Sequence, residues 1–483
     1  MWITSFLSSA IIFCSSPTPN TMSDSEDIKF SLNVVVNKQR TKVLYAEVDS
    51  DFADILLSFL SLPLGTIVRI LGKHYGDESP VVGSLTNLYN SLSNLNSDHF
   101  STESCKQMLL NPIKTLQNER CKLKLNVDDT PLTKCFTCAN KDCMYKSTHM
   151  GFYYDTSRCD CRNSRLSHDI GILEFPESVY TESGASFIIS DDLQIFPSET
   201  GHAIRILSGL GITGTDVTEL MDVTFGFNQV MDLLKGSLLS ETPLTDVILN
   251  KGLLNSIAVK CDKCISPVDQ VVEQSSSNDK KTTVKAIMQE STNRLFFVEA
   301  DGNFVEFLFS LFTIPLGEVE RLLGGSTGLK NIDNLYRTLG DINVDKYLKT
   351  QATKTMLLEP KLPTGYVSKD NILPLIEETD KFYIGSALVY SVKSPKGPGN
   401  YVKGQKMYMA TDDLSVTPLY TASSISIFNK LKVPLNDVKE LELDIGLKEA
   451  LRILKASLTS TSALTDGLMI KPTSMKKPKQ EHA

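Results

Sequence analysis

A chain of 483 residues is too long for one compact core and long enough for two to four domains. Hydrophobic residues make up 41% and charged residues 22%, which excludes an intrinsically disordered chain. The formal net charge of −8 is spread without a dominant basic block. Such a surface does not attract polyphosphate, so we expect no nucleic-acid partner.

Residues 1–27 are predicted to be disordered or dispensable for the fold. The stretch 2–14 is apolar and uncharged like a signal-peptide core, but no Lys or Arg precedes it and no clear cleavage site follows. Met22 then opens an acidic segment, so we expect Met22 to be the working start. No stretch of eighteen apolar residues exists, so no membrane span is predicted. We expect a cytoplasmic protein, with a nuclear location left open by a basic tail and secretion disfavoured.

The first folded elements are predicted to be a β-hairpin and a helix. Residues 32–36 and 43–47 are rich in β-forming side chains and are separated by polar residues. Asp51 suits the N-cap of a helix whose apolar residues recur at helical spacing. Pro63-Leu-Gly65 interrupts this helix, and a second short helix is expected from Thr66.

Later elements mix strands and helices. The sequence predicts a strand near 187–190 and helices near 203–208, 216–221 and 228–238. Strands and helices do not alternate regularly as in βαβ units, which indicates the α+β class.

The chain repeats itself. Residues 51–65 (DFADILLSFLSLPLG) return at 303–317 (NFVEFLFSLFTIPLG), with an identical or similar residue at every position. Five shorter matches follow in the same order: 87–89 with 334–336, 108–112 with 356–360, 191–193 with 412–414, 234–238 with 454–458, and 244–246 with 464–466. Such an ordered series predicts a tandem duplication of a module of roughly 240 residues that opens with a β-hairpin.

The module boundaries follow from these matches. We predict a first module at 28–260, a polar linker at 261–281, a second module at 282–472 and a basic tail at 473–483. The first module is longer, and its extra residues lie in an insertion at about 113–184.

This insertion holds a cysteine cluster. Five of the ten cysteines lie between Cys135 and Cys161, which favours metal binding in a reducing compartment over a disulfide framework. Cys135-Phe-Thr-Cys138 lets a tight turn point two thiolates at one metal, and Cys159-Asp-Cys161 supplies a second pair. We therefore predict a zinc-ribbon-like insertion in which Cys135, Cys138, Cys159 and Cys161 bind one structural Zn²⁺ and leave no open position for catalysis.

Other assignments of the cysteines stay open. Cys143 could replace a member of either pair, and His149 is a weaker substitute. Cys261 and Cys264 form a lone Cys-x-x-Cys, which we interpret as two free thiols, although it could join the cluster or act as a redox pair. The alternative to a zinc site is an ordinary loop with reduced thiols.

The combined features resemble the plant family called domain of unknown function 674. The resemblance rests on the hairpin, the Leu-Pro-Leu-Gly helix break, the Asn-Leu-Tyr segment, the cysteine insertion, the Asp-Asp-Leu strand and the Leu-Thr-Asp ending. It covers nearly everything from Ile28 to Lys471. It implies an intracellular plant protein without an established activity or catalytic residues. The second cysteine pair of that family is spaced Cys-x-x-Cys, one residue longer than Cys159-Asp-Cys161.

Two further motifs invite a functional interpretation. The glycines at 209, 211 and 214 match a dinucleotide pattern, but a helix is expected before them, where that fingerprint needs a strand. We therefore expect a helix–helix turn. Asp191 and Asp192 are adjacent on a strand and point to opposite faces, so we expect them to bind nearby backbone N–H groups instead of flanking a substrate.

No nucleophile elbow or cysteine-protease signature is present, and the six histidines are scattered. The sequence therefore favours a non-catalytic interaction or scaffold protein that binds a protein or a small ligand through its module surfaces. The alternative is an enzyme of an unrecognised class with its site between the two modules. A structural protein that binds no ligand is the third class.

Overall fold

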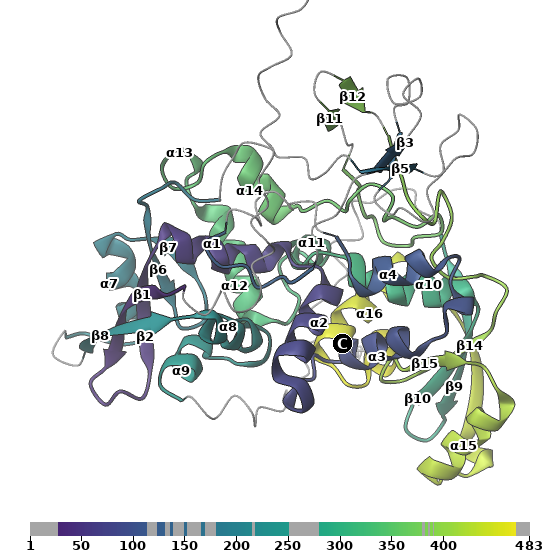
Figure 1. The fold of residues 1–483 in the computed structure, drawn as a ribbon. Helices are drawn as coiled ribbons and strands as arrows, with labels where there is room; N and C mark the ends of the chain where they lie inside the picture. The colour runs from purple at the N-terminus through teal and green to yellow at the C-terminus, as the bar shows by residue number, and fades with distance from the viewer. Residues whose placement is uncertain are drawn as a thin grey trace, which may run out of the picture.

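The computed structural model describes residues 28–113, 123–130, 136–138, 149–151, 166–169, 180–214, 218–250, 280–378, 382–384, 387–389 and 391–469. It is mixed α+β, which confirms the predicted class. Two five-stranded antiparallel sheets lie at opposite ends of the molecule with helices between them (Figure 1). We refer to the described residues of 28–250 as the first half and to those of 280–469 as the second half.

The two sheets have the same topology. The first has the order β7-β6-β2-β1-β8 and the second the order β15-β14-β10-β9-β16. The strands of the first sheet are β1 (Phe30–Asn37), β2 (Val43–Asp49), β6 (Ser186–Ser190), β7 (Ile195–Pro197) and β8 (Thr218–Phe225). Those of the second are β9 (Thr282–Gln289), β10 (Arg294–Ala300), β14 (Tyr408–Thr411), β15 (Val416–Pro418) and β16 (Val438–Ile445).

Alternating side chains orient the first sheet. Strand β1 buries Phe30, Leu32, Val34 and Val36, while the residues between them are exposed or half-buried. Because successive strand residues point to opposite faces, this alternation turns one face of the sheet toward the helices. The predicted hairpin is confirmed.

The helix after the hairpin begins slightly earlier than the sequence suggested. Helix α1 (Ser50–Ser58) is capped by Asp49, whose carboxylate accepts the N–H of Phe52 at 2.9 Å. The prediction of Asp51 as the cap is wrong, because Asp49 is the residue with extended backbone and Asp51 already lies in the first turn. Pro63 ends this helical run as predicted, and α2 (Leu64–Tyr75) follows it.

The other helices of the first half are α3 (Leu85–Asn94), α4 (Glu103–Leu110), α7 (Thr200–Gly209), α8 (Phe227–Leu239) and α9 (Pro243–Ile248). Those of the second half are α10 (Gly302–Ser310), α11 (Leu316–Leu322), α12 (Lys330–Asp341), α13 (Val344–Tyr347), α14 (Gln351–Leu358), α15 (Thr421–Leu431), α16 (Leu447–Thr459) and α17 (Ala463–Leu468).

The helix expected at 216–221 is wrong, because β8 covers most of that range. Every residue of β8 pairs with a residue of β1, from Thr218 opposite Asn37 to Phe225 opposite Phe30. This long-range pairing outweighs the weak local helical pattern. The turn at Gly211 therefore joins a helix to a strand. As expected, a helix and not a strand precedes it, so the dinucleotide fingerprint has no structural support.

The two halves meet at their Pro-Leu-Gly segments. The N–H of Leu64 donates to the carbonyl of Ile314 at 3.0 Å, and the N–H of Leu316 donates to the carbonyl of Leu62 at 2.9 Å. Pro63 and Pro315 lie opposite each other between these bonds. Because each half contributes the same pair of groups, the contact has pseudo-two-fold symmetry.

Helices of each half contact the sheet of the other. Helix α12 packs against β7 and α8, and α3 packs against β15. Two matching hydrogen bonds fix these contacts: Ile195 N–H to Thr338 Oγ1 at 3.0 Å, and Val416 N–H to Ser91 Oγ at 2.9 Å. One hydrophobic core contains residues from both halves. The predicted module boundaries stay a sequence-based prediction.

A smaller sheet also joins the halves. Its order is β13-β4-β3-β5, with β3 (Phe136–Cys138), β4 (His149–Gly151) and β5 (Leu166–Asp169) from the first half and β13 (Ser391–Lys393) from the second. Strand β13 runs parallel to β4. A separate hairpin, β11 (Phe382–Ile384) with β12 (Ala387–Val389), completes the described strands.

Candidate functional site

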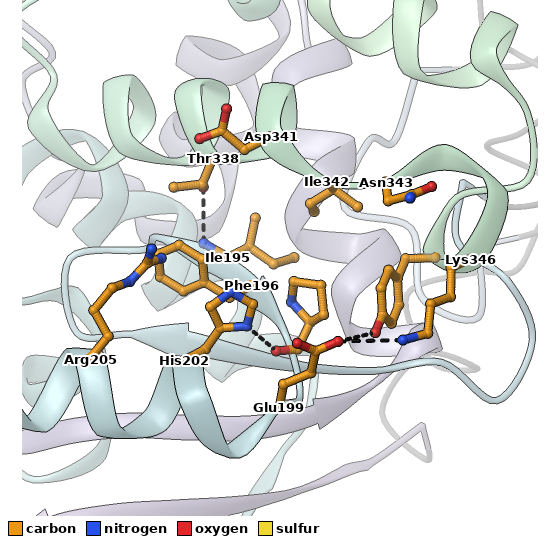
Figure 2. Close-up of a pocket in the computed structure, with 12 residues that line it drawn as sticks. Ile195, Phe196, Glu199, His202, Arg205, Thr338, Asp341, Ile342, Asn343 and Lys346 are labelled. Atoms are coloured by element: carbon orange, nitrogen blue, oxygen red, sulfur yellow. Dashed lines mark hydrogen bonds and ion pairs between the residues drawn. The ribbon is translucent and has the colours of Figure 1, made fainter.

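A groove of about 340 Å³ opens between the two halves (Figure 2). One wall comes from β7 and α7 of the first half, and the facing wall comes from α12 and α13 of the second. The interlocked packing of the halves therefore creates the groove, because neither half supplies both walls.

The wall from the first half is built around an aromatic ring. Phe196 is nearly buried, and the imidazole of His202 stacks on it with ring centroids 5.2 Å apart and an angle of 19°. The guanidinium carbon of Arg205 lies 4.7 Å from the same ring centroid. Because His202 and Arg205 are three residues apart on α7, both project from the same side of that helix.

His202 is held in one orientation by the backbone. Its Nδ1 lies 3.0 Å from the carbonyl oxygen of Pro197. A carbonyl oxygen can only accept, so Nδ1 carries the proton in this bond. In the neutral ring, Nε2 then carries the lone pair and is the nitrogen that can take up a proton.

An ion pair ties α7 to α13. Glu199 accepts a hydrogen bond from the hydroxyl of Tyr347 at 2.8 Å and one from the ammonium of Lys346 at 3.4 Å (Figure 2). These bonds, the one from Tyr347 first, lower the pKa of Glu199 below its ordinary value. The carboxylate is therefore ionised at neutral pH and balances the charge of Lys346.

Two charged groups of the groove have no such partner. Among the described residues, Arg205 makes no hydrogen bond or ion pair. Its guanidinium makes a cation–π contact with the Phe196 ring. Asp341, the last residue of α12, likewise has no recorded hydrogen bond or ion pair there. Figure 2 shows the two side chains on facing walls.

The other end of the molecule has a matching groove of about 300 Å³ between α3 and β15. Strand register and helix position pair its residues with those of the first groove. Thr417 stands in the place of Phe196, and Asn94 in that of Asp341. Ser426 on α15 corresponds to Arg205 on α7 but does not belong to the lining of the second groove. Within the described part of the chain, no ionisable residue lines this second groove. The charges are thus a property of one groove and not a requirement of the fold.

The predicted zinc ligands are mostly outside the described residues. Cys138 ends strand β3 and is 1% exposed, whereas Cys135, Cys159 and Cys161 lie outside the described ranges. Within those ranges, no group of three or more His, Cys, Asp or Glu side chains is placed to hold a metal ion. The zinc site therefore stays a prediction, and Cys143, Cys261 and Cys264 also lie outside the described residues.

The interpretation of Asp191 as a structural residue is confirmed. Its two oxygens accept the N–H and the hydroxyl of Thr245, both at 2.8 Å, and so fix the start of α9 against the sheet. Burial raises the pKa of Asp191 to about 6, and the bonds from Thr245 oppose that rise. Asp412 accepts the N–H of Thr465 in the same way.

Sequence motifs did not point to the groove. None of its charged residues belongs to a recognised pattern, and they come from segments more than 130 residues apart. The signal in the sequence was a difference between the two similar halves: Ser426 aligns with Arg205, and Asn94 aligns with Asp341.

Comparison with known proteins places the chain in one family. In the part of the chain that the structure describes, no helix combines the length and the apolar character of a membrane span. Neither the curated proteins nor the solved structures contain a match. The family model described as "Protein of unknown function (DUF674)" matches residues 26–446. The chain, which resembled this family by its motifs, therefore belongs to the DUF674 family.

Proposed function

We propose that this protein is a non-catalytic binding protein that holds a small ligand in the groove between α7 and α12–α13. The observation that carries the proposal is the asymmetry of the two grooves. The fold forms both, but only the first contains Arg205, Asp341 and the stacked Phe196–His202 pair. Unpaired charge around a cavity is a feature of ligand sites, and the fold does not need it.

The proposal includes a tandem duplication. The equal strand orders and the reciprocal bonds at Pro63 and Pro315 support an origin from one repeated module. Duplication would leave one groove free to acquire charged residues while the other kept its structural role. The family resemblance further supports an intracellular plant protein, and we propose a cytoplasmic location.

A matched pair of variants tests the groove. Asp341 and Asn94 are exposed at corresponding positions, so tryptophan at either place obstructs one groove and spares the core. We expect the full-length protein to retain small molecules from a metabolite extract, detected by native mass spectrometry. Asp341→Trp should lose them, and Asn94→Trp should keep them. Equal retention by both variants, or no retained molecule in the unmodified protein, would contradict the proposal.

An enzyme with its site between the halves is the alternative. It is favoured by one observation: Nε2 of His202, beside the groove, has no hydrogen-bond partner among the described residues and could act as a general base. The non-catalytic proposal expects no turnover of ester, phosphoester, peptide or glycoside substrates. Turnover that His202→Asn abolishes would support the enzyme instead.

We also propose a structural zinc ion in the first half, held by Cys135, Cys138, Cys159 and Cys161. The support is their spacing and the burial of Cys138 at the end of a short strand. Protein purified without chelator should contain about one zinc per chain, because four thiolates complete a tetrahedral site.

Cys138→Ser should release this zinc, since the remaining thiolates no longer complete the site. Cys261→Ser serves as its control and should keep the metal. Metal analysis by mass spectrometry reads out both variants. A metal-free protein whose thermal stability does not change in chelator would exclude the site.

A further inference from the structure

Two opposite charges of the groove have no partner among the residues that the structure describes. Lys346 and Glu199 pair with each other, so they contribute no net charge. Arg205 and Asp341 are the remaining charged residues of the lining, and no hydrogen bond or ion pair is recorded for either within the described residues. The groove is therefore neutral overall but has a free cation on one wall and a free anion on the other.

Arg205 is prepared for an anionic group. Its guanidinium lies over the Phe196 ring, which fixes the side chain, and none of its N–H donors bonds to a residue that the structure describes. The planar fork of a guanidinium matches the two oxygens of a carboxylate. An anionic ligand group would therefore gain charge-assisted bonds without competing with a protein carboxylate.

Asp341 is the free acceptor of the facing wall. The carbonyls of Gly340 and Ile342 beside it both accept hydrogen bonds from Lys354, at 2.6 and 2.8 Å. The side-chain oxygen of Asn343 accepts the N–H of Asp345. With these neighbours occupied, the carboxylate of Asp341 is the group left to receive a cation.

The groove that holds both charges is small and partly apolar. Ile195, Phe196 and Ile342 contribute to its lining, and the volume of the whole groove, about 340 Å³, lies near the lower end of the range for small-molecule sites. It therefore suits a short hydrocarbon segment with a charged group at each side.

We infer that the groove binds a small amino acid or amino-acid-like zwitterion, with its carboxylate on Arg205 and its ammonium on Asp341. This inference rests on the proposed function of the groove and names the class of its ligand. The second groove has Asn94 in the place of Asp341 and no residue of α15 in its lining, so it has neither charge and is not expected to bind such a molecule.

The test uses the full chain and defined probes. Three zwitterions with different charge separations, L-leucine, 4-aminobutanoate and 6-aminohexanoate, are titrated by saturation-transfer NMR. Hexanoate and hexylamine, which carry one charge each, are the comparison. We expect at least one zwitterion to bind saturably and at least tenfold more tightly than either singly charged probe, because each loses one charge-assisted contact.

Two variants assign the contacts. Arg205→Gln and Asp341→Asn keep the approximate shape of each exposed side chain and remove its charge, and each should weaken zwitterion binding at least tenfold. Lys38→Gln, which removes an exposed positive charge from the distant hairpin turn, should leave binding unchanged.

Three results would overturn the inference: no zwitterion binds, hexanoate or hexylamine binds as tightly, or either groove variant binds the zwitterion as the unmodified protein does. These outcomes differ from a failure of the proposed function. That failure would appear in the metabolite-extract experiment, as an absence of any retained molecule or as retention insensitive to Asp341→Trp.

Discussion

Gly317→Ala is expected to lower the free energy of unfolding by about 3 kcal/mol or more, because no space exists for the added methyl group. A Cβ atom at Gly317 would lie 2.5 Å from the carbonyl oxygen of Leu357 and 3.2 Å from that of Leu60. Both are backbone atoms, so a side-chain rotation cannot relieve the overlap. The closer overlap lies within the second half, between α11 and α14, and the tighter contact with Leu60 extends the effect to the first half.

The same argument applies to Gly65. Its Cβ would lie 2.9 Å from the Cβ of Phe312 and 3.2 Å from the carbonyl oxygen of Leu109. Gly340→Ala is the matched control, since Gly340 lies on the exposed side of α12 with no atom within 4 Å of an added Cβ. Alanine there should change stability by less than about 1 kcal/mol, in the stabilising direction.

Urea unfolding followed by circular dichroism measures the stability of Gly317→Ala, Gly65→Ala and Gly340→Ala. Equal stability of Gly317→Ala and Gly340→Ala would contradict the close packing around Gly317. A destabilised Gly317→Ala protein should also bind less ligand, because α11 leads into α12, which forms one wall of the groove.

The local architecture could be predicted where short-range signals were strong. The β1–β2 hairpin follows from alternating apolar residues, and the break at Pro63 follows from the missing N–H of proline. Helix α8 was also expected from its apolar spacing. The cap was misplaced by two residues because both Asp49 and Asp51 precede the apolar run, and only backbone geometry distinguishes them.

Long-range features could not be predicted in this way. Strand β8 was taken for a helix because its identity depends on pairing with β1, nearly 190 residues away in sequence. The packing of α12 on β7 and of α3 on β15 depends on which sheet each helix covers, and local periodicity carries no information on that choice. The groove forms where a helix of one half packs on the sheet of the other, so its position could not be derived from the sequence of either half alone.

A comparison of the two halves in sequence nevertheless pointed to the residues of the groove. The sequences of the two halves agree strongly where the halves contact each other, as in the segments around Pro63 and Pro315. They differ in charge at Arg205 and Asp341, where the fold has no need of a particular side chain. In a chain with two similar halves, such divergence indicates function better than similarity does.

A buried carboxyl group, that of Asp54, bonds to a segment that in turn bonds to α13, one wall of the groove. Asp54 on α1 is 1% exposed, and its carboxylate accepts the N–H of Thr181 at 2.8 Å. The adjacent Glu182 donates its N–H to the carbonyl of Tyr347, at the end of α13. Burial raises the pKa of Asp54 from 3.8 to about 7, and the bonds from Thr181 oppose the rise without cancelling it.

This raised pKa makes stability depend on pH. Below pH 3.8 the carboxyl is protonated in both the folded and the unfolded chain, so its full contribution to stability is present. Between 3.8 and about 7 the unfolded chain releases the proton while the folded protein keeps it. Stability is therefore lost as the pH rises through this window, and above it the loss is complete.

Asp54→Asn should reverse that loss, because the amide oxygen can still accept the N–H of Thr181 and carries no charge. We expect the variant to be more stable than the unmodified protein by about 2–4 kcal/mol at pH 8, and by clearly less at pH 5. Urea unfolding at the two pH values measures the difference. Asp77→Asn, at an exposed position just after α2, is the control and should not show a gain of this size at pH 8. A gain of equal size at both pH values, or a loss of stability at pH 8, would show that Asp54 is not held in its protonated form by burial.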